Sequence, residues 1–92
     1  MIQSFLDPGT AAIFAQIPAR RWAPIARQAL RKLIMLDQAR ALNDLRVPPG
    51  NRLEPLRRDR AGQHSIRVND QYRICFRWHD GDAFDVELTD YH

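Results

Sequence analysis

The chain has 92 residues, of which 45% are hydrophobic, and a formal net charge of +3. This length suits one domain, residues 1–92, and this apolar content argues against disorder. No stretch approaches the roughly 18 uncharged apolar residues that a membrane helix needs, and the N-terminus lacks the basic and apolar regions of an export signal. Cys75 is the single cysteine, which excludes an internal disulfide and a cysteine-based metal cluster. We therefore expect a cytoplasmic protein with no membrane partner.

Charge is distributed unevenly along the second half of the chain. Seven arginines lie at positions 52, 57, 58, 60, 67, 73 and 77, whereas residues 78–92 include five acids and neither lysine nor arginine. Arginine is permanently charged and presents a planar set of donors that matches phosphate. The segment therefore favours a polyanionic partner, and an ordinary solvated surface is the alternative explanation.

The first half of the chain predicts one short strand followed by helices. Residues 2–5 predict the strand, and Thr10 is placed to cap a short helix that breaks near Pro18. Apolar residues at helical spacing, with arginines between them, predict a long helix from Ile25 to about Leu45. The sequence Val-Pro-Pro-Gly-Asn at 47–51 ends it.

From residue 64 onward the hydrophobic period changes to two, which is typical of strands. Residues 64–68, 72–78 and 84–89 predict an antiparallel meander with tight turns at 69–70 and 80–81. The side chains expected to face the core are Tyr72, Ile74, Phe76, Trp78, Phe84, Val86 and Leu88. The sequence therefore predicts an α+β fold, with two to three N-terminal helices on one face of a small, mainly antiparallel, twisted sheet whose other face is open to water.

The open face of the sheet is the first candidate site. It is expected to bring together Ser65, Arg67, Arg73, Cys75 and Arg77. Several arginines on one side of a sheet can hold a phosphate, and for Arg73 we favour this role. Cross-strand pairing of Arg67 and Arg77 with Asp85 and Glu87 is the alternative, and for Arg77 the two readings are evenly matched. Cys75 is expected to be a small strand residue rather than a nucleophile.

Two further clusters could supply acid–base chemistry. Glu54 and Arg57 are three residues apart, and a carboxylate beside arginines can act as a general base while the arginines hold phosphate. Such neighbours are also ordinary surface ion pairs, worth under about 1 kcal/mol. The terminal residues Asp90, Tyr91 and His92 offer an acceptor, an aromatic hydroxyl and an imidazole, and the last strand can hold them beside the arginines.

Histidine spacing predicts no metal site. His64 begins a strand, where its ring either stacks on a base or covers the strand's edge. We expect RNA and its phosphates to be bound by Arg57, Arg58, Arg60, Arg67, Arg73, Arg77 and His64.

The segment from Arg52 to Phe76, the opening residues 1–5 and the ending 85–92 resemble the HigB toxins of the RelE/ParE superfamily. The likeness covers nearly the whole chain, and the long helix is its least diagnostic part. It implies a RelE-like fold, ribosome-dependent cleavage of mRNA in the ribosomal A site, and a HigA-type antitoxin with a helix-turn-helix domain as partner. We expect this cleavage to need no metal or other cofactor.

Position by position, the resemblance implies an active site at Glu54, Arg57, Arg73, Asp90, Tyr91 and His92. In the expected chemistry Arg73 and Arg57 hold the phosphate. His92 is the preferred general acid or base, and Glu54 is the candidate for the complementary proton transfer. Asp90 orients the cluster, and Tyr91 stacks on a base or positions the phosphate.

Two positions depart from the family's usual pattern. The place of Glu54 is a histidine in some relatives, and the place of Arg57 is often a lysine followed by glycine, where this chain has Arg58. The identity of the general base therefore stays open. Two other functions also stay open: a ParE-like toxin that binds DNA gyrase, and a non-catalytic module that binds RNA or the ribosome.

Overall fold

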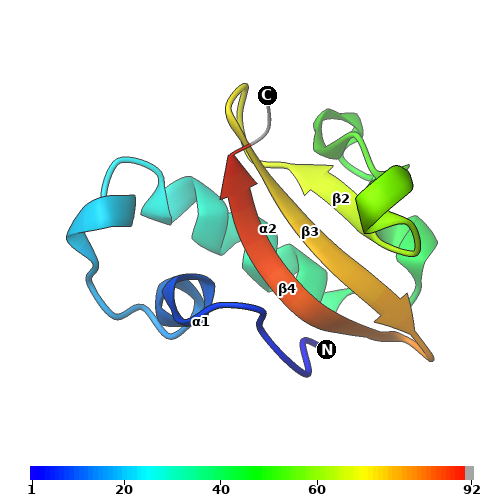
Figure 1. Cartoon of the computed structure of the whole chain (residues 1–92), viewed down its shortest axis with the longest axis horizontal. Coiled ribbons are helices and arrows are strands. Elements are labelled where there is room, and N and C mark those ends of the chain that lie inside the picture. Colours follow the sequence, from blue (N-terminus) through cyan, green and yellow to red (C-terminus); the bar gives the residue numbers. More distant parts are fainter. Residues whose placement is uncertain (91–92) are drawn as a thin grey trace.

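The C-terminal half of the chain forms the sheet. The computed structural model describes residues 1–90, in which β1 (Glu54–Pro55), β2 (His64–Arg67), β3 (Tyr72–His79) and β4 (Asp82–Asp90) pair antiparallel in the order β1-β2-β3-β4 (Figure 1). Asp80 and Gly81 between β3 and β4 have φ values of 49° and 83°, as expected for a tight hairpin turn. The predicted meander is confirmed.

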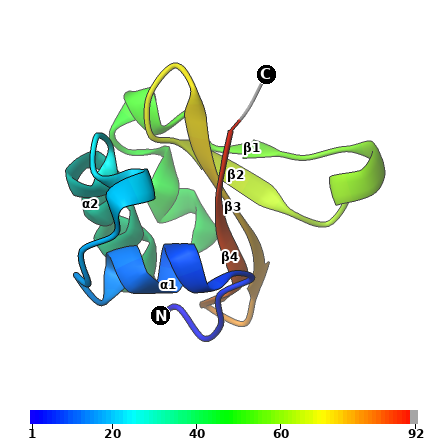
Figure 2. The same ribbon diagram turned by 60° about the vertical axis from the view of Figure 1, so that its left-hand side comes forward.

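The helices cover one face of this sheet. They are α1 (Pro8–Phe14) and α2 (Ala26–Gln38), accompanied in residues 1–90 by the short 3-10 helices η1 (Arg20–Trp22), η2 (Leu42–Arg46), η3 (Pro49–Asn51) and η4 (Arg58–Arg60) (Figures 1 and 2). Fully buried side chains between the layers include Leu33, Leu36, Ile66, Ile74, Phe76 and Val86. The predicted α+β arrangement is confirmed. Within residues 1–90, every helix is too short or too polar to cross a membrane.

The N-terminal residues differ in detail from the prediction. Ile2 and Phe5 make single parallel bridges to Ala83 and Val86 of β4 rather than a continuous strand. The helix cap is also one turn earlier than predicted, because the side chain of Asp7 accepts the backbone N–H of Thr10 at 3.0 Å. Asp is a strong N-cap residue and proline suits the first helical position, so the helix begins at Pro8.

The long helix ends at Gln38, well before the predicted end at Leu45. Asp44 causes the early end, since its Oδ2 accepts the backbone N–H groups of Arg40 and Ala41, both at 3.0 Å. These contacts turn the chain into η2, which places Leu45 in the core with no exposed surface. A helical period of apolar residues does not distinguish this arrangement from one continuous helix.

The last strand contains an irregularity that the alternation did not predict. The pairing shifts between Cys75 and Arg77, and Asp85 adopts a φ of 53°. Such a bulge puts two successive residues on one side, so Phe84 pairs with Arg77 and Ala83 takes the core position opposite Trp78. The prediction that Phe84 faces the core is therefore wrong, whereas Val86 and Leu88 are buried as expected.

Candidate active site

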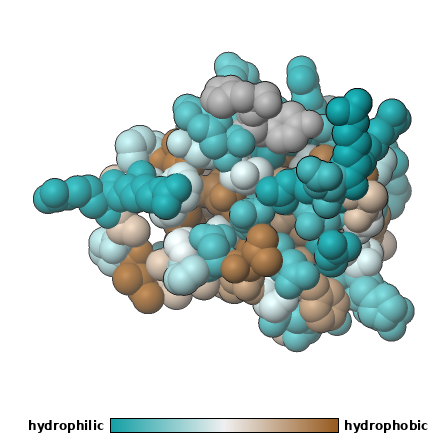
Figure 3. Space-filling view, viewed as in Figure 1, coloured by the Kyte–Doolittle hydropathy of each residue, from teal (hydrophilic) through white to brown (hydrophobic). Residues whose placement is uncertain are grey.

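One face of the sheet carries Arg67, Arg73 and Arg77 and is here called the arginine face. It is the face that α1 and α2 do not cover. Cross-strand partners share a face, and one row of partners crosses all four strands: Glu54, Ser65, Cys75 and Glu87. The hairpin of β1 and β2 projects on this side of the sheet (Figure 2). Hydrophilic residues gather over this hairpin on the molecular surface (Figure 3).

The centre of the arginine face is more enclosed than the sequence predicted. Ser65 is 0% exposed and Cys75 is 1% exposed, although both lie on the side expected to be open to water. Burial raises the pKa of the Cys75 thiol, with a smaller opposing effect from the Arg60 guanidinium. A thiol with a raised pKa is a weak nucleophile at neutral pH, consistent with Cys75 as a packing residue.

Arg73 is enclosed at the centre of this face, with only 11% of its side chain exposed. Its Nε donates to Ser65 Oγ at 2.9 Å, and its Nη2 donates to the backbone carbonyl of Arg52 at 2.9 Å. Nη2 also lies 3.3 Å from Glu54 Oε1. A guanidinium removed from water in this way needs such partners, and they orient its plane.

Glu54 joins Arg73 to the projecting hairpin. Its side chain is 46% exposed, so it contacts Arg73 and remains accessible to a ligand. Beside it is a hollow of about 500 Å³ lined by Glu54, Pro55, Leu56, Arg57, Arg58 and Arg60. Arg57 and Arg58 are exposed. A carboxylate and several guanidinium groups therefore border one hollow, an arrangement that can bind a phosphodiester beside a proton acceptor.

The other arginines of this face, and Arg60 of η4, pair with acids. Arg60 Nη1 lies 3.0 Å from Glu87 Oε1, and Arg77 Nε lies 3.6 Å from Asp85 Oδ2. The structure thus contains the ion pair considered for Arg77, while Arg67 pairs with Asp70 rather than with Asp85 or Glu87. Partly exposed pairs of this kind contribute little, about 0–1 kcal/mol. A phosphate can therefore compete for these arginines.

Two predicted site residues lie on the other side of the sheet. Asp90 pairs with Tyr72, whose ring lies on the helix side and contacts Trp22 edge-on with the ring centroids 5.7 Å apart. The Oδ2 atom of Asp90 accepts a hydrogen bond from Gln71 Nε2 at 3.1 Å. His64 pairs with Phe76, and the two rings are stacked with their centroids 6.3 Å apart.

Their positions limit the roles that Asp90 and His64 can have in the site. Asp90 and His64 do not share the arginine face with Arg73, because alternate strand residues point to opposite faces. Burial lowers the pKa of His64, which favours its neutral form. The other predicted residues of the C-terminus, Tyr91 and His92, lie outside the described residues.

The sequence did not identify every contact that shapes the site. The alternation placed Ser65 on this face, but its bond to Arg73 depends on the register of β2 against β3. The carbonyl of Arg52 leaves no sequence signal, because its direction follows from a left-handed backbone with φ 46° and ψ 54°. The pair between Arg60 and Glu87 joins residues that are distant in the sequence. Residues 1–90 contain no group of three or more His, Cys, Asp or Glu side chains that could hold a metal ion.

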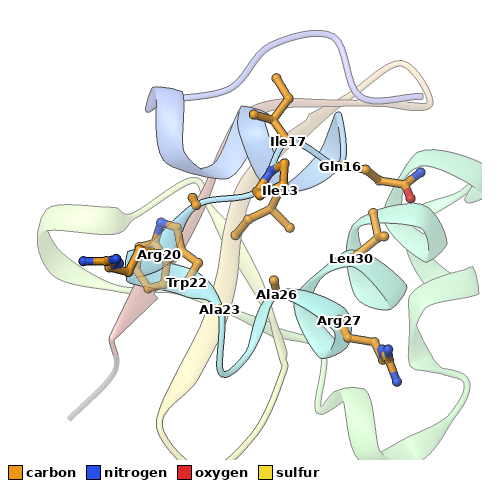
Figure 4. Close-up of a pocket in the computed structure, with 11 residues that line it drawn as sticks. Ile13, Gln16, Ile17, Arg20, Trp22, Ala23, Ala26, Arg27 and Leu30 are labelled. Atoms are coloured by element: carbon orange, nitrogen blue, oxygen red, sulfur yellow. The ribbon is translucent and has the colours of Figure 1, made fainter.

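A separate pocket of about 620 Å³ lies on the helix side, between α1, η1 and α2 (Figure 4). Ile13, Ile17 and Leu30 line it, and Arg20 and Arg27 stand at its border. Its lining residues, all of which the structure describes, include neither acid nor histidine. The pocket therefore lacks the acid–base groups found beside Arg73.

Comparisons with known proteins identify the family. Residues 12–92 match the family model described as the RelE-like toxin of type II toxin-antitoxin system HigB. The chain is 52% identical over 64 residues to "Toxin HigB-1" of Vibrio cholerae, covering 70% of this chain and 67% of that protein. It is 44% identical over 97 residues to "Endoribonuclease HigB" of Proteus vulgaris, covering 100% of both chains.

Solved structures show the same fold at low sequence identity. A mutant of YafQ from E. coli matches with a TM-score of 0.65 and 11% identity, covering 98% of this chain and 91% of that one. A YoeB–YefM complex from Staphylococcus aureus matches with a TM-score of 0.56 and 16% identity, covering 100% and 98%. The RelE-like fold expected from the sequence is thus confirmed. Together with the family match, these findings show that the chain belongs to the HigB family of RelE-like toxins of type II toxin–antitoxin systems.

Proposed function

We propose that this protein is an endoribonuclease that cleaves mRNA in the ribosomal A site and thereby inhibits translation and growth. The name of the Proteus vulgaris relative, an endoribonuclease that is 44% identical, supports this activity. The observation that carries the proposal is the placement of Arg73, a largely buried guanidinium 3.3 Å from the accessible carboxylate of Glu54. A toxin acting on ribosomes works in the cytoplasm.

The proposed reaction needs no metal ion or cofactor. The ribose 2′-hydroxyl loses its proton and attacks the adjacent phosphorus, while the bond from phosphorus to the 5′-oxygen breaks and that oxygen gains a proton. The products are a 2′,3′-cyclic phosphate and a 5′-hydroxyl. Arg73 and Arg57 stabilise the additional negative charge on the phosphate through charge-assisted hydrogen bonds. The ribosome contributes by holding the mRNA in a shape ready for attack.

The proton transfers are assigned to Glu54 and His92. Glu54 borders the hollow of the β1–β2 hairpin and contacts Arg73, which supports its role as one partner, and His92 is the complementary acid or base. Asp90 lies away from Arg73 on the opposite face, so its proposed role is limited to positioning the C-terminal residues. Tyr91 is proposed to stack on a base or to position the phosphate.

Other arginines are proposed to bind RNA outside the reacting phosphate. Arg58 is exposed beside the hollow, next to Arg57 of the reacting site, and Arg60, Arg67 and Arg77 can exchange their carboxylate partners for phosphate. His64 is not proposed as an RNA contact, because its ring lies against Phe76 on the helix side. Binding through arginines and phosphates weakens as salt concentration rises.

Membership of a toxin–antitoxin family implies an antitoxin partner. We propose that this partner is of the HigA type and carries a helix-turn-helix domain. The other proposed partners are the 70S ribosome and its bound mRNA.

The first prediction concerns Arg73 and is tested with purified ribosomes carrying a short mRNA. Arg73→Ala should slow cleavage by about 10²- to 10³-fold, as expected when one preorganised donor to a developing charge is lost. Glu54→Gln, which keeps the size of the half-exposed side chain but removes its negative charge, should slow it by about 10²- to 10⁴-fold. The measurement is primer extension, combined with chemical analysis of the product ends.

Arg46→Ala is the matched control. Arg46 is an exposed arginine of η2 that donates to Asn43 and lies outside the proposed site, so this variant should cleave at the parental rate. Thermal unfolding checks that each variant is folded. Intact mRNA with the parental protein, or parental rates for both Arg73→Ala and Glu54→Gln, would refute the proposed function and favour a binding role without catalysis.

A further inference from the structure

Arg73 is held by two groups that the proposed reaction does not itself use. We propose that Ser65 and the backbone carbonyl of Arg52 are positioning groups that fix the guanidinium of Arg73 for phosphate binding. The inference rests on the proposed function, because it explains how the phosphate-binding arginine is prepared for its substrate.

The burial of Ser65 is the first observation. Its side chain is 0% exposed in the middle of the sheet, between Glu54 of β1 and Cys75 of β3. A buried hydroxyl is costly unless it is hydrogen-bonded, and Ser65 Oγ accepts Nε–H of Arg73 at 2.9 Å. The Cys75 side chain beside it is also buried. The polar group in this enclosed position is therefore directed at Arg73.

The backbone of Arg52 is the second observation and is independent of the first. Arg52 adopts φ 46° and ψ 54°, a left-handed conformation that disfavours residues with a side chain and is often retained at functional sites. Its N–H donates to Pro49 O at 3.1 Å, and its own carbonyl accepts Nη2–H of Arg73 at 2.9 Å. The unusual turn thus directs a carbonyl at the guanidinium.

The residue before this turn is anchored in the interior. Asn51 is 0% exposed, donates through Nδ2 to Leu45 O at 3.1 Å and accepts from Lys32 Nζ at 2.6 Å. The segment that presents the Arg52 carbonyl is therefore tied to α2 and η2, so the carbonyl has little freedom to move.

Together the two acceptors define the orientation of Arg73. A guanidinium has five N–H groups in one plane, and contacts at Nε and Nη2 fix both the plane and its rotation. The other N–H groups then point in set directions before RNA arrives. Donors that need no reorganisation stabilise a developing charge more effectively.

The second prediction concerns these two positions and uses single-turnover cleavage on ribosomes carrying mRNA. Ser65→Ala should lower the rate at saturating ribosome concentration by about 10- to 100-fold, since a misplaced catalytic group costs up to about 10²-fold. The ribosome concentration giving half-maximal rate should change less than threefold. Ser65→Thr, which keeps the hydroxyl, should recover most of the lost rate.

A matched pair at Arg52 tests the carbonyl without relying on Ser65. Arg52→Gly and Arg52→Val both remove the guanidinium of residue 52, but glycine adopts a left-handed φ readily and valine, being β-branched, does not. We expect Arg52→Val to cleave at least tenfold more slowly than Arg52→Gly. If Ser65→Ala proves unfolded, this comparison decides the question.

A nuclear magnetic resonance measurement separates this inference from the proposed function. The Nε–H signal of Arg73, assigned by its loss in Arg73→Lys, should be protected from exchange with water in the parental protein and in Ser65→Thr. In Ser65→Ala it should exchange at least tenfold faster. This result does not depend on cleavage, so it stands even if the parental protein cleaves no mRNA.

Two outcomes would overturn the inference. One is an unprotected Nε–H signal in the parental protein. The other is parental cleavage by a folded Ser65→Ala together with equal rates for Arg52→Val and Arg52→Gly. Arg73→Ala, measured in parallel, reports on the proposed function itself.

Discussion

At the residue scale, two arginines on the same strand and the same face differ in how far they are exposed, because their neighbours differ. The side chain of Arg73 is 11% exposed, whereas that of Arg77 is 48% exposed and lies 3.6 Å from Asp85. Alternation along β3 places both on the arginine face but does not distinguish them. The difference comes from β1 and the preceding turn, which contact Arg73 through Glu54 and Arg52.

The third prediction concerns His64 and pH. Burial holds the pKa of His64 below its ordinary value of 6.5, so the unfolded chain binds a proton at this site more readily than the folded chain. The stability associated with neutral His64 is therefore fully present above pH 6.5 and is lost as pH falls through the lower folded-state pKa. The free energy of unfolding, measured by urea denaturation at a series of pH values, should therefore become smaller as the pH is lowered from neutral.

His64→Gln provides the comparison for this prediction. The variant lacks the titrating ring, so its free energy of unfolding should decline less on acidification than that of the parent. Equal declines in the two proteins would show that His64 is not responsible and that other groups titrate in this range.

At the scale of elements, side chains of single acids decide where helices begin and end. Asp44 ends α2 early by accepting two backbone N–H groups, and Asp7 begins α1. Both acids were visible in the sequence. The competing signals were a continuous helical period up to Leu45 and Thr10 as an alternative cap, and neither alternative could be dismissed from local sequence alone.

The fourth prediction concerns the cap of α1. Asp7 accepts the backbone N–H of Thr10 at 3.0 Å and the Thr10 hydroxyl at 2.7 Å. Asp7→Ala should lower the free energy of unfolding by about 1 kcal/mol, as measured by urea denaturation monitored by circular dichroism. Asp7→Asn keeps a capping oxygen and should lose less. A loss for Asp7→Asn equal to that for Asp7→Ala would contradict the cap assignment.

At the scale of the whole molecule, the first ten residues protect the exposed edge of the sheet. Strand β4 is an edge strand, and Ile2 and Phe5 bridge to Ala83 and Val86 along it. Thr10 continues this cover, because its buried Oγ1 accepts the backbone N–H of Leu88 at 2.9 Å. An uncovered edge invites pairing with other chains, so these contacts complete the sheet.

The fifth prediction tests this long-range contact. Thr10→Val keeps the shape of the side chain but removes the acceptor for Leu88, which leaves a buried N–H without its partner. The free energy of unfolding should fall by about 1–3 kcal/mol, and Thr10→Ser should retain most of it. Urea denaturation of the three proteins is the measurement, and equal stability of Thr10→Val and the parent would contradict the role assigned to Thr10.

Much of the site was accessible from the sequence because strand alternation is a local property. Arg67, Arg73, Arg77, Ser65 and Cys75 share a face as predicted. The alternation failed at Phe84, where a bulge at Asp85 reverses the pattern. For Asp90, alternation does give the observed side, because Asp90 is two residues beyond the core-facing Leu88 and therefore lies on the face opposite to Arg73; the expectation that it lies beside the arginines did not take this into account.

By itself, the sequence determined the α+β class, the meander and the grouping of arginines, because hydrophobic period, turn residues and charge act between neighbours in the chain. Only the tertiary structure decided which arginine is enclosed, which carbonyl and hydroxyl hold it, and which ion pairs occupy the others. Those contacts join residues such as Arg52 and Arg73, 21 positions apart. Their geometry depends on strand register and on the path of the intervening hairpin, which no local pattern encodes.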